Sequence, residues 1–199
     1  MIRSKQELHN YIACDLGQYM GPFKYIFEIV RLKVTGNENY RIVRLLYALR
    51  HYEYYYNKTD RTYFDFILKS FWNYRYRQCE LAANIYIGFN VTGKGLHIVH
   101  PGFRHLHTVP KIGENCTILP MVLIGKKYPN TEAKAIIGNN CYISTGVTIL
   151  APIVIGNNVT IGAGAVVTKD IPDNAIVAGV PARIIGKNDT MNNDVYRQQ

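Results

Sequence analysis

The sequence predicts a mainly β fold, a coil of parallel strands that follows an α-helical N-terminal region. In the C-terminal half an aliphatic residue recurs every six positions with one interruption, and glycine directly follows five of these residues. A period of six fits neither an amphipathic helix nor a hairpin sheet. It is typical of a coil in which each flat face takes one hexapeptide and buries its aliphatic residue. The recurring residues are Ile112, Ile118, Ile124, Ile137, Ile143, Ile149, Ile155, Ile161 and Val167.

The first 84 residues carry helical patterns instead. Ser4 and Glu7 match a capping box, which predicts a helix that ends near Gly21. Apolar residues at helical spacing predict a second helix over residues 39–56 and a third over residues 61–83. The apolar stripe of the third helix consists of Phe64, Ile67, Leu68, Phe71 and Trp72. We expect these helices to cap one end of the coil, because terminal repeats need a cover.

The helical region is also rich in tyrosine, as in the stretch from Tyr52 to Tyr56, and in arginine. Tyrosine joins a large apolar body to a polar tip, so packing between helices or subunits is the favoured interpretation. Contact with a sugar or a lipid-linked acceptor is the alternative. The arginines concerned are Arg44, Arg50, Arg61, Arg75 and Arg77.

Composition narrows the class of protein. No apolar run approaches the roughly 20 residues that span a bilayer, and the N-terminus lacks the apolar stretch of a signal peptide. The formal charge of +9 favours anionic partners such as phosphorylated small molecules or a membrane surface, and peripheral membrane contact stays open. No nucleic-acid partner is expected, because no binding module is present. The scattered cysteines are typical of reduced, mostly buried thiols in a cytoplasmic protein: Cys14, Cys79, Cys116 and Cys141.

Two irregularities interrupt the six-residue period. Ile98 and Leu106 stand eight apart, so two extra residues are expected to bulge from one corner around Pro101. Between Ile124 and Ile137 the spacing is thirteen, so residues 126–134 must leave the coil as a loop. Such a loop on a rigid coil is a favoured place for function.

The run from Gly95 to Gly102, the hexads, and the closing stretch from Ile161 to Gly186 resemble the hexapeptide-repeat acyltransferases. Within that family the chain is most similar to the serine acetyltransferase-like enzymes encoded with capsule and surface-polysaccharide genes. The resemblance covers about half of the chain. It implies a left-handed parallel β-helix, assembly as a homotrimer, and a loop that reaches a neighbouring subunit. The expected division is a helical region (1–84), a β-helix acyltransferase domain (85–187) and a C-terminal tail (188–199).

Acyl transfer to a hydroxyl needs a base beside the acceptor oxygen, and histidine side chains titrate near neutral pH. By position, His100 matches the catalytic histidine of the resembled enzymes, and we expect it to face the cleft between subunits. The neighbouring histidines are interpreted as solvated surface residues. A zinc site is not expected, because a coil would scatter these side chains and no cysteine or carboxylate joins them. They are His97, His105 and His107.

The resemblance also implies acetyl-CoA as co-substrate, lying along the coil between two subunits, with no metal. Thr145 and Ala163 match positions that contact the pantetheine arm, and a small residue there lets the arm approach the backbone. Thr168, Lys169 and Arg183 match positions near the nucleotide end, where cations pair with phosphates. The alternative interpretations are tight corners for the small residues, solubility for Lys169 and capping of the last coil for Arg183.

The sequence departs from the serine acetyltransferase pattern in three places, which concern the acceptor and the orientation of the catalytic histidine. Val99 stands where those enzymes carry a carboxylate before the catalytic histidine, and Ile85 stands where a second acid orients the imidazole. Glu132 and Ala133 replace an arginine and a histidine in the inserted loop. L-serine is therefore a poor candidate for the acceptor. With the orienting acid missing, the sequence identifies no partner for His100, although a backbone carbonyl could serve.

The functional hypothesis is an O-acetyltransferase that moves acetyl from acetyl-CoA to a hydroxyl of a sugar or polysaccharide precursor. Two alternatives stay open. One is an N-acetyltransferase acting on an amino-sugar nucleotide through the same carrier site. The other is a hexapeptide-repeat protein that binds glycans and has lost catalysis.

Overall fold

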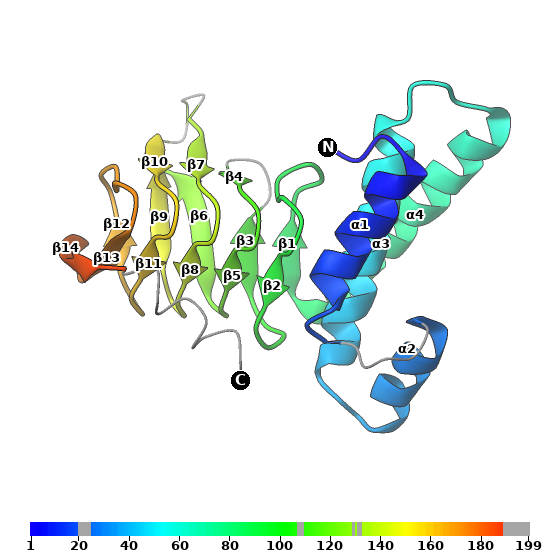
Figure 1. Cartoon of the computed structure of the whole chain (residues 1–199), viewed down its shortest axis with the longest axis horizontal. Helices are drawn as coiled ribbons and strands as arrows, with labels where there is room; N and C mark the ends of the chain where they lie inside the picture. Colours follow the sequence, from blue (N-terminus) through cyan, green and yellow to red (C-terminus); the bar gives the residue numbers. More distant parts are fainter. Residues whose placement is uncertain (20–24, 107–109, 129, 131–132, 189–199) are drawn as a thin grey trace.

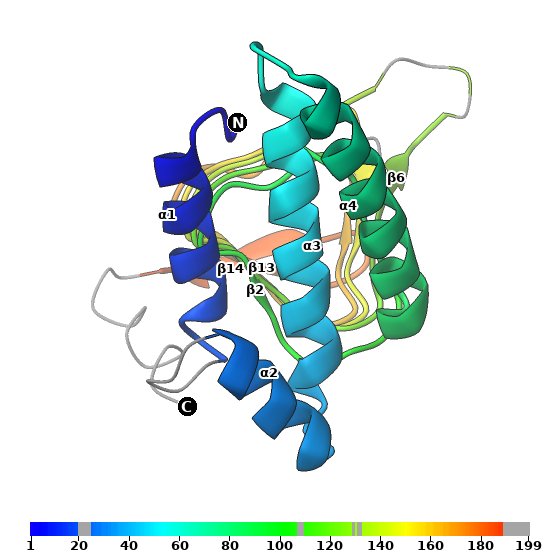
Figure 2. The ribbon, with the colours of Figure 1, turned by 90° about the vertical axis from the view of Figure 1, so that its right-hand side faces the viewer.

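The computed structural model describes residues 1–19, 25–106, 110–128, 130 and 133–188. Helices pack across one end of a long coil of strands, which extends away from them to the C-terminal strands (Figure 1). Down the coil axis, α3 crosses the end of the coil with α1 on one side and α4 on the other (Figure 2). The helices are α1 (Lys5–Leu16), α2 (Tyr25–Val34), α3 (Asn39–Asn57) and α4 (Tyr63–Ala83).

The coil consists of short strands arranged in three sheets. Their orders are β1-β3-β6-β9-β12 in the first sheet, β10-β7-β4 in the second and β14-β13-β11-β8-β5-β2 in the third. The chain visits the sheets in rotation, and all pairs are parallel except β13 with β14. The strands are β1 (Ile85–Ile87), β2 (His97–Ile98), β3 (Arg104–Leu106), β4 (Pro110–Ile112), β5 (Thr117–Ile118), β6 (Val122–Lys126), β7 (Ala135–Ile137), β8 (Tyr142–Ile143), β9 (Thr148–Ala151), β10 (Ile153–Ile155), β11 (Thr160–Ile161), β12 (Val166–Val167), β13 (Ala175–Ala178) and β14 (Arg183–Lys187).

The aliphatic period is the register of these sheets. In the third sheet Ile98 pairs with Ile118, which pairs with Ile143, which pairs with Ile161. All four side chains are buried inside the coil. Burial of an isoleucine side chain contributes about 1.5–3 kcal/mol, so stacking one per face and coil supplies the core. The prediction of a parallel coil with inward aliphatic residues is confirmed.

Glycine after the inward isoleucine is required at the corner between the second and third sheets. A Cβ on Gly113 would lie 2.7 Å from the backbone carbon of Gly138, and a Cβ on Gly138 would lie 2.7 Å from that of Gly156. Such distances leave no room for a side chain. At Gly125 nothing lies within 4 Å of the added Cβ, so the same explanation is wrong there.

The helical predictions are confirmed in type and differ at their ends. Ser4 and Glu7 form the predicted capping box of α1, but this helix ends at Leu16, where the Gly17 N–H bonds the carbonyl of Ala13. Gly21, the predicted end, lies outside the described residues. Helix α4 begins at Tyr63 behind a second capping box, in which the carboxylate of Asp65 bonds the Thr62 N–H. Helix α2 is absent from the sequence prediction.

Helix α4 packs on α3 through a face that includes charged residues. Four of the five residues of its predicted apolar stripe are exposed, and the fifth, Trp72, packs against the core. Asp65, Tyr76 and Glu80 are buried, whereas Phe64 is 73% and Phe71 is 50% exposed. Packing, the favoured interpretation of the tyrosines, holds for the buried ones. For example, the ring of Tyr52 stacks on that of Tyr76 at 5.7 Å.

A buried ion network joins the helices to the first coil. The guanidinium of Arg50 on α3 donates to the carboxylates of Asp15 at 2.6 Å and Glu53 at 2.9 Å. It also donates to the carbonyl oxygens of Thr92 at 3.1 Å and Gly93 at 2.7 Å. The other Asp15 oxygen accepts from two coil N–H groups, those of Gly95 and Leu96. Arg50 is therefore a structural residue, and acceptor contact, the alternative for the arginines, is wrong for it.

Two further observations bear on the class of protein that composition predicted. The cysteines are free, and three of the four are buried: Cys79, Cys116 and Cys141. Within the described residues, no helix combines the length and the apolar character needed to cross a membrane.

Candidate active site

One corner of the coil carries three of the six predicted site residues. It is the turn by which the chain passes from the third sheet to the first. Two positions beyond the paired isoleucines Ile98, Ile118, Ile143 and Ile161, successive coils present His100, Pro120, Thr145 and Ala163. The register therefore aligns the predicted base and two predicted carrier contacts in a single row, the corner column.

Hydrogen bonds to backbone carbonyl oxygens hold the corner column together. The Thr145 hydroxyl donates to the carbonyl oxygen of Pro120 at 2.9 Å, and the N–H of Gly164 donates to the carbonyl oxygen of Thr145 at 2.9 Å. Thr145 and Ala163 are exposed, and Gly164 has a φ of +67° with nothing within 4 Å of an added Cβ. The outer surface of this corner is thus backbone and small side chains, which a slender extended ligand can approach closely.

The His100 imidazole at the head of the corner column has an acidic partner. Its Nδ1 lies 2.5 Å from Oε1 of Glu38, the residue that precedes α3. A carboxylate only accepts, so Nδ1 carries the proton, and in the neutral imidazole Nε2 is left as the acceptor. The imidazole is 61% exposed, so the ring lies on the outside of the coil. The sequence identified no partner for His100, and the contact with Glu38 fills that gap.

The bulge that carries His100 is built around a buried arginine. The guanidinium of Arg104 donates to the carbonyl oxygens of Val99, Gly102 at 3.1 Å and Ile118 at 3.3 Å. Burial lowers the pKa of Arg104 to about 10. These bonds fix the two extra residues of this coil, and His100 adopts a φ of +57° within it. The predicted bulge around Pro101 is therefore an ordered platform for the imidazole.

The α1 side of the same coil is fixed by Tyr19. Its hydroxyl accepts from the N–H of Ile98 at 2.6 Å and donates to the carbonyl of Ile98 at 2.9 Å. Burial raises the pKa of Tyr19 well above its usual range, so the phenol stays protonated. Ile98 is thereby anchored two residues before His100.

The remaining predicted carrier residues lie at the far end of the coil. Lys169 and Arg183 line one hollow of about 340 Å³, and the partly buried Thr168 precedes Lys169. The guanidinium of Arg183 donates to the carbonyl oxygen of Ala182 at 3.0 Å. The structure brings these two cations together but records no contact between them and Thr145 or Ala163.

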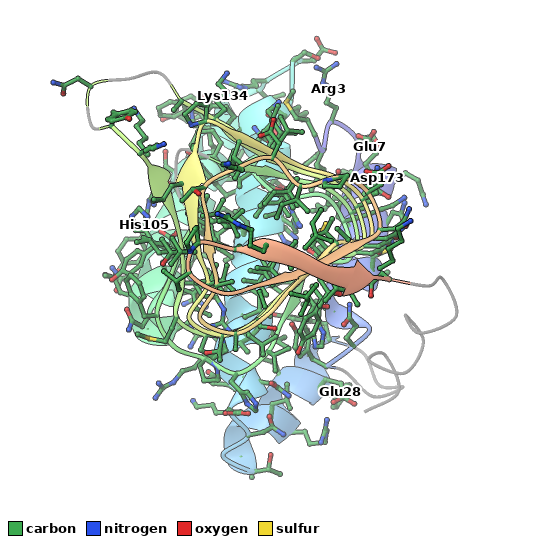
Figure 3. All side chains as sticks on the ribbon, turned by 90° about the vertical axis from the view of Figure 1, so that its left-hand side faces the viewer. Arg3, Glu7, Glu28, His105, Lys134 and Asp173 are labelled. Carbon is green, nitrogen blue, oxygen red and sulfur yellow. The ribbon has the colours of Figure 1, made fainter. Side chains whose placement is uncertain are left out.

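The other histidines have separate environments. His97 is half-buried with its ring 5.5 Å from that of Tyr19, and burial lowers the pKa of His97. His105 points away from the coil interior (Figure 3), 6.2 Å from the ring of Tyr86. His107 lies outside the described residues. Among the side chains that the structure describes, no three histidines, cysteines or carboxylates are grouped to hold a metal ion.

Two of the residues that depart from the serine acetyltransferase pattern are buried apolar side chains. Ile85 is fully buried and Ala133 is 6% exposed, while Glu132 lies outside the described residues. The inserted loop projects from the coil between β6 and β7 (Figure 1). Its residues 129, 131 and 132 are also outside the description.

Comparison with known proteins agrees with this architecture. Residues 134–169 match the family model for the bacterial transferase hexapeptide, six repeats. Galactoside O-acetyltransferase of Escherichia coli (strain K12) is 38% identical over 117 residues, covering 53% of this chain and 52% of that protein. Serine acetyltransferase of Bacillus pumilus (strain SAFR-032) is 34% identical over 96 residues, covering 44% of this chain and 42% of that protein. The chain thus spans about half the length of the curated relatives it matches.

A solved structure matches over most of the chain. The crystal structure of serine acetyltransferase in complex with coenzyme A from Brucella abortus strain S19 aligns with a TM-score of 0.56 and 25% identity. The alignment covers 92% of this chain and 67% of that one. The chain therefore carries transferase hexapeptide repeats on a parallel coil, with helices at its N-terminal end, and is similar in fold to a serine acetyltransferase.

Proposed function

We propose that the chain is an acetyl-CoA-dependent O-acetyltransferase that acts on a sugar hydroxyl, with His100 as the general base. The observation that carries the proposal is the corner column, with an exposed imidazole paired to Glu38 at its head. The names of the relatives support it, because a galactoside O-acetyltransferase and serine acetyltransferases share the repeats. The coenzyme A complex with the same fold supports the choice of carrier.

The proposed reaction uses the two nitrogens of His100 differently. Nε2 takes the proton of the acceptor hydroxyl, and the hydroxyl oxygen attacks the thioester carbonyl. Glu38 holds the Nδ1 proton and stabilises the imidazolium that forms. Collapse of the tetrahedral adduct releases the thiolate of coenzyme A, which receives the proton from Nε2. Atoms and charge balance without a metal or a redox step.

The carrier fits the exposed residues of the corner column and the far hollow. We assign Thr145 and Ala163 to the pantetheine arm, because their small side chains expose the backbone beside them. Thr168, Lys169 and Arg183 are assigned to the phosphate end, because two exposed cations share a hollow there. The exposed corner column leaves one side of the site open, so we infer that a second copy in a homotrimer of left-handed coils completes it. The division into residues 1–84, 85–187 and 188–199 is part of the same proposal.

The acceptor is proposed to be a sugar or polysaccharide precursor rather than L-serine. The carboxylate that helps bind the amino acid in serine acetyltransferases is replaced by Val99 here, and the arginine and histidine of the inserted loop are replaced by Glu132 and Ala133. The galactoside relative acts, by its name, on a sugar.

The test is release of free thiol from acetyl-CoA in the presence of a panel of monosaccharides, oligosaccharides and amino-sugar nucleotides. Thiol release that depends on one sugar supports the proposal. Mild alkali removes an O-acetyl group and leaves an N-acetyl group, so an alkali-stable product would establish the N-acetyltransferase instead. Binding of glycan with no thiol release would establish a non-catalytic protein.

Replacement of Glu38 by glutamine is expected to lower kcat by roughly 10- to 100-fold, the effect typical of a partner that orients a functional histidine. The KM for acetyl-CoA should stay unchanged, because Glu38 orients the imidazole and is not assigned to the carrier. Glu38→Asp, which keeps the charge, should restore part of the loss. Steady-state thiol release measures all three, and Glu114→Gln is the matched control, because Glu114 is a partly exposed carboxylate that pairs with Lys94 and not with His100. A full rate in Glu38→Gln would remove Glu38 from the site.

A further inference from the structure

A pocket lies beside His100 on its helical side. It has a volume of about 510 Å³ and is lined by the turn between α2 and α3 together with Pro101. Pro101 directly follows His100, and Glu38, another lining residue, bonds the imidazole. The pocket therefore lies beside the His100–Glu38 pair, on the side of the ring where Nδ1 meets the carboxylate.

The pocket is on the opposite side of His100 from the proposed carrier residues. Strand β2, which precedes His100, is the edge strand of the third sheet, and the sheet continues from it to β5, β8 and β11. Thr145 and Ala163 follow β8 and β11, further from the helices. A ligand in the pocket would thus meet the imidazole from the side that the carrier leaves free.

The charge of the pocket is positive. Lys33, the penultimate residue of α2, and Arg41 in the first turn of α3 both line it, and both are exposed. Within the described part of the chain, neither side chain forms an ion pair with a carboxylate. The one acidic residue of the lining, Glu38, is engaged by His100. Two available cations beside one paired carboxylate favour an anionic ligand.

We propose that this pocket binds the acidic group of the acceptor, so that the substrate is a sugar that carries a carboxylate or a phosphate. The inference rests on the proposed function, because it uses His100 as the reacting group. Lys33 and Arg41 hold the anion, and the sugar hydroxyl is presented to Nε2 at the mouth of the pocket. Pro101 and the buried Leu32 supply the apolar wall against which the ring lies.

The test compares three probes on the full chain: glucuronate for a carboxylate, glucose 1-phosphate for a phosphate, and glucose as the neutral control. Binding is measured by calorimetry and acetyl transfer by thiol release. The pocket variant is Lys33→Gln with Arg41→Gln. The matched control is Arg3→Gln with Lys5→Gln, which removes the same charges from exposed positions on α1 and before it.

At least one anionic probe should bind more tightly than glucose, and the pocket variant should weaken that binding roughly tenfold or more, the effect of losing hydrogen bonds to a charged group. The control variant should bind like the natural protein, and the KM for acetyl-CoA should be unchanged in both. Whichever anionic probe responds identifies carboxylate or phosphate as the group that is held.

Distinct results separate the two proposals. Tighter binding of an anionic probe that is lost in the pocket variant, with no thiol release from any acceptor, would keep the pocket and reject the acetyltransferase. Thiol release with a neutral sugar that the pocket variant leaves unchanged, without preference for either anion, would keep the acetyltransferase and reject the pocket. A raised KM for acetyl-CoA in the pocket variant would assign the cations to the carrier and overturn the inference.

Discussion

Replacement of His100 by alanine is expected to lower the rate of acetyl transfer by about 100-fold or more, the usual contribution of a positioned general base. The variant removes the only side chain of the corner column that can accept a proton, since the aligned positions are Pro120, Thr145 and Ala163. Binding of coenzyme A should be retained, because the carrier is assigned to other residues. Thiol release under saturating acetyl-CoA measures the first effect, and calorimetric titration with coenzyme A measures the second.

His105→Ala is the matched control for this prediction. His105 is the middle residue of β3, and its side chain points outward from the first sheet (Figure 3). Its loss should therefore leave the rate near that of the natural protein. A His100→Ala variant that is folded and retains more than about a tenth of the natural rate would be incompatible with general-base catalysis by this residue.

Replacement of Arg50 by methionine is expected to reduce the free energy of unfolding by about 3–5 kcal/mol, the cost of removing one partner of a buried ion pair. The carboxylates of Asp15 and Glu53 are 0% and 2% exposed, and both lose their guanidinium partner. The bonds to Thr92 and Gly93 that attach α3 to the first coil are lost as well. Urea unfolding at a fixed protein concentration measures the difference.

The same variant should show a pH dependence with a defined sign. Burial raises the pKa of Asp15, and the charge of Arg50 opposes that rise. Without Arg50, burial acts alone and the folded-state pKa of Asp15 rises further above its unfolded value. A carboxyl with a raised folded-state pKa keeps its stability below the unfolded pKa and loses it as the pH rises through the folded pKa. The deficit of Arg50→Met should therefore shrink as the pH is lowered through the raised folded-state pKa of Asp15 towards its ordinary value of 3.8.

Arg3→Met is the control, because Arg3 is exposed and surface substitutions usually change stability by less than about 0.5 kcal/mol. A deficit of Arg50→Met below about 1 kcal/mol at neutral pH, equal to that of an exposed pair, would mean that the network does not anchor the helices to the coil.

Local patterns predicted the coil well, because each hexapeptide places one aliphatic residue inside the coil. An inward isoleucine such as Ile143 contacts its counterparts one coil away, so the period in the sequence is also the register in space. Periodicity predicted that residues 61–83 are helical, but it did not predict which side packs. Phe64 and Phe71 face outward, while the side that meets α3 includes Asp65 and Glu80, whose charges are satisfied by capping and by Arg77. Helix α2 was missed because no capping box precedes it in the sequence and its apolar residues do not form a single stripe.

The site was only partly predictable. The resemblance selected His100 by position, and register then aligned it with Thr145 and Ala163. Glu38 could not be found, since it stands 62 residues before His100 and reaches it only because α3 packs on the coil end. The one available signal was an acidic residue next to the predicted start of a helix. The pocket beside it depends on α2, which the sequence did not reveal.

The corner column also works as a ruler. Each coil advances by one strand spacing of about 4.8 Å, so the two regular steps from Pro120 to Ala163 set a gap of roughly 10 Å between these corners. Adding or deleting one whole repeat changes that gap by a single increment and leaves every corner intact. In such an architecture, the number of repeats sets how far the hollow lined by Lys169 and Arg183 lies from the helices at the other end of the coil.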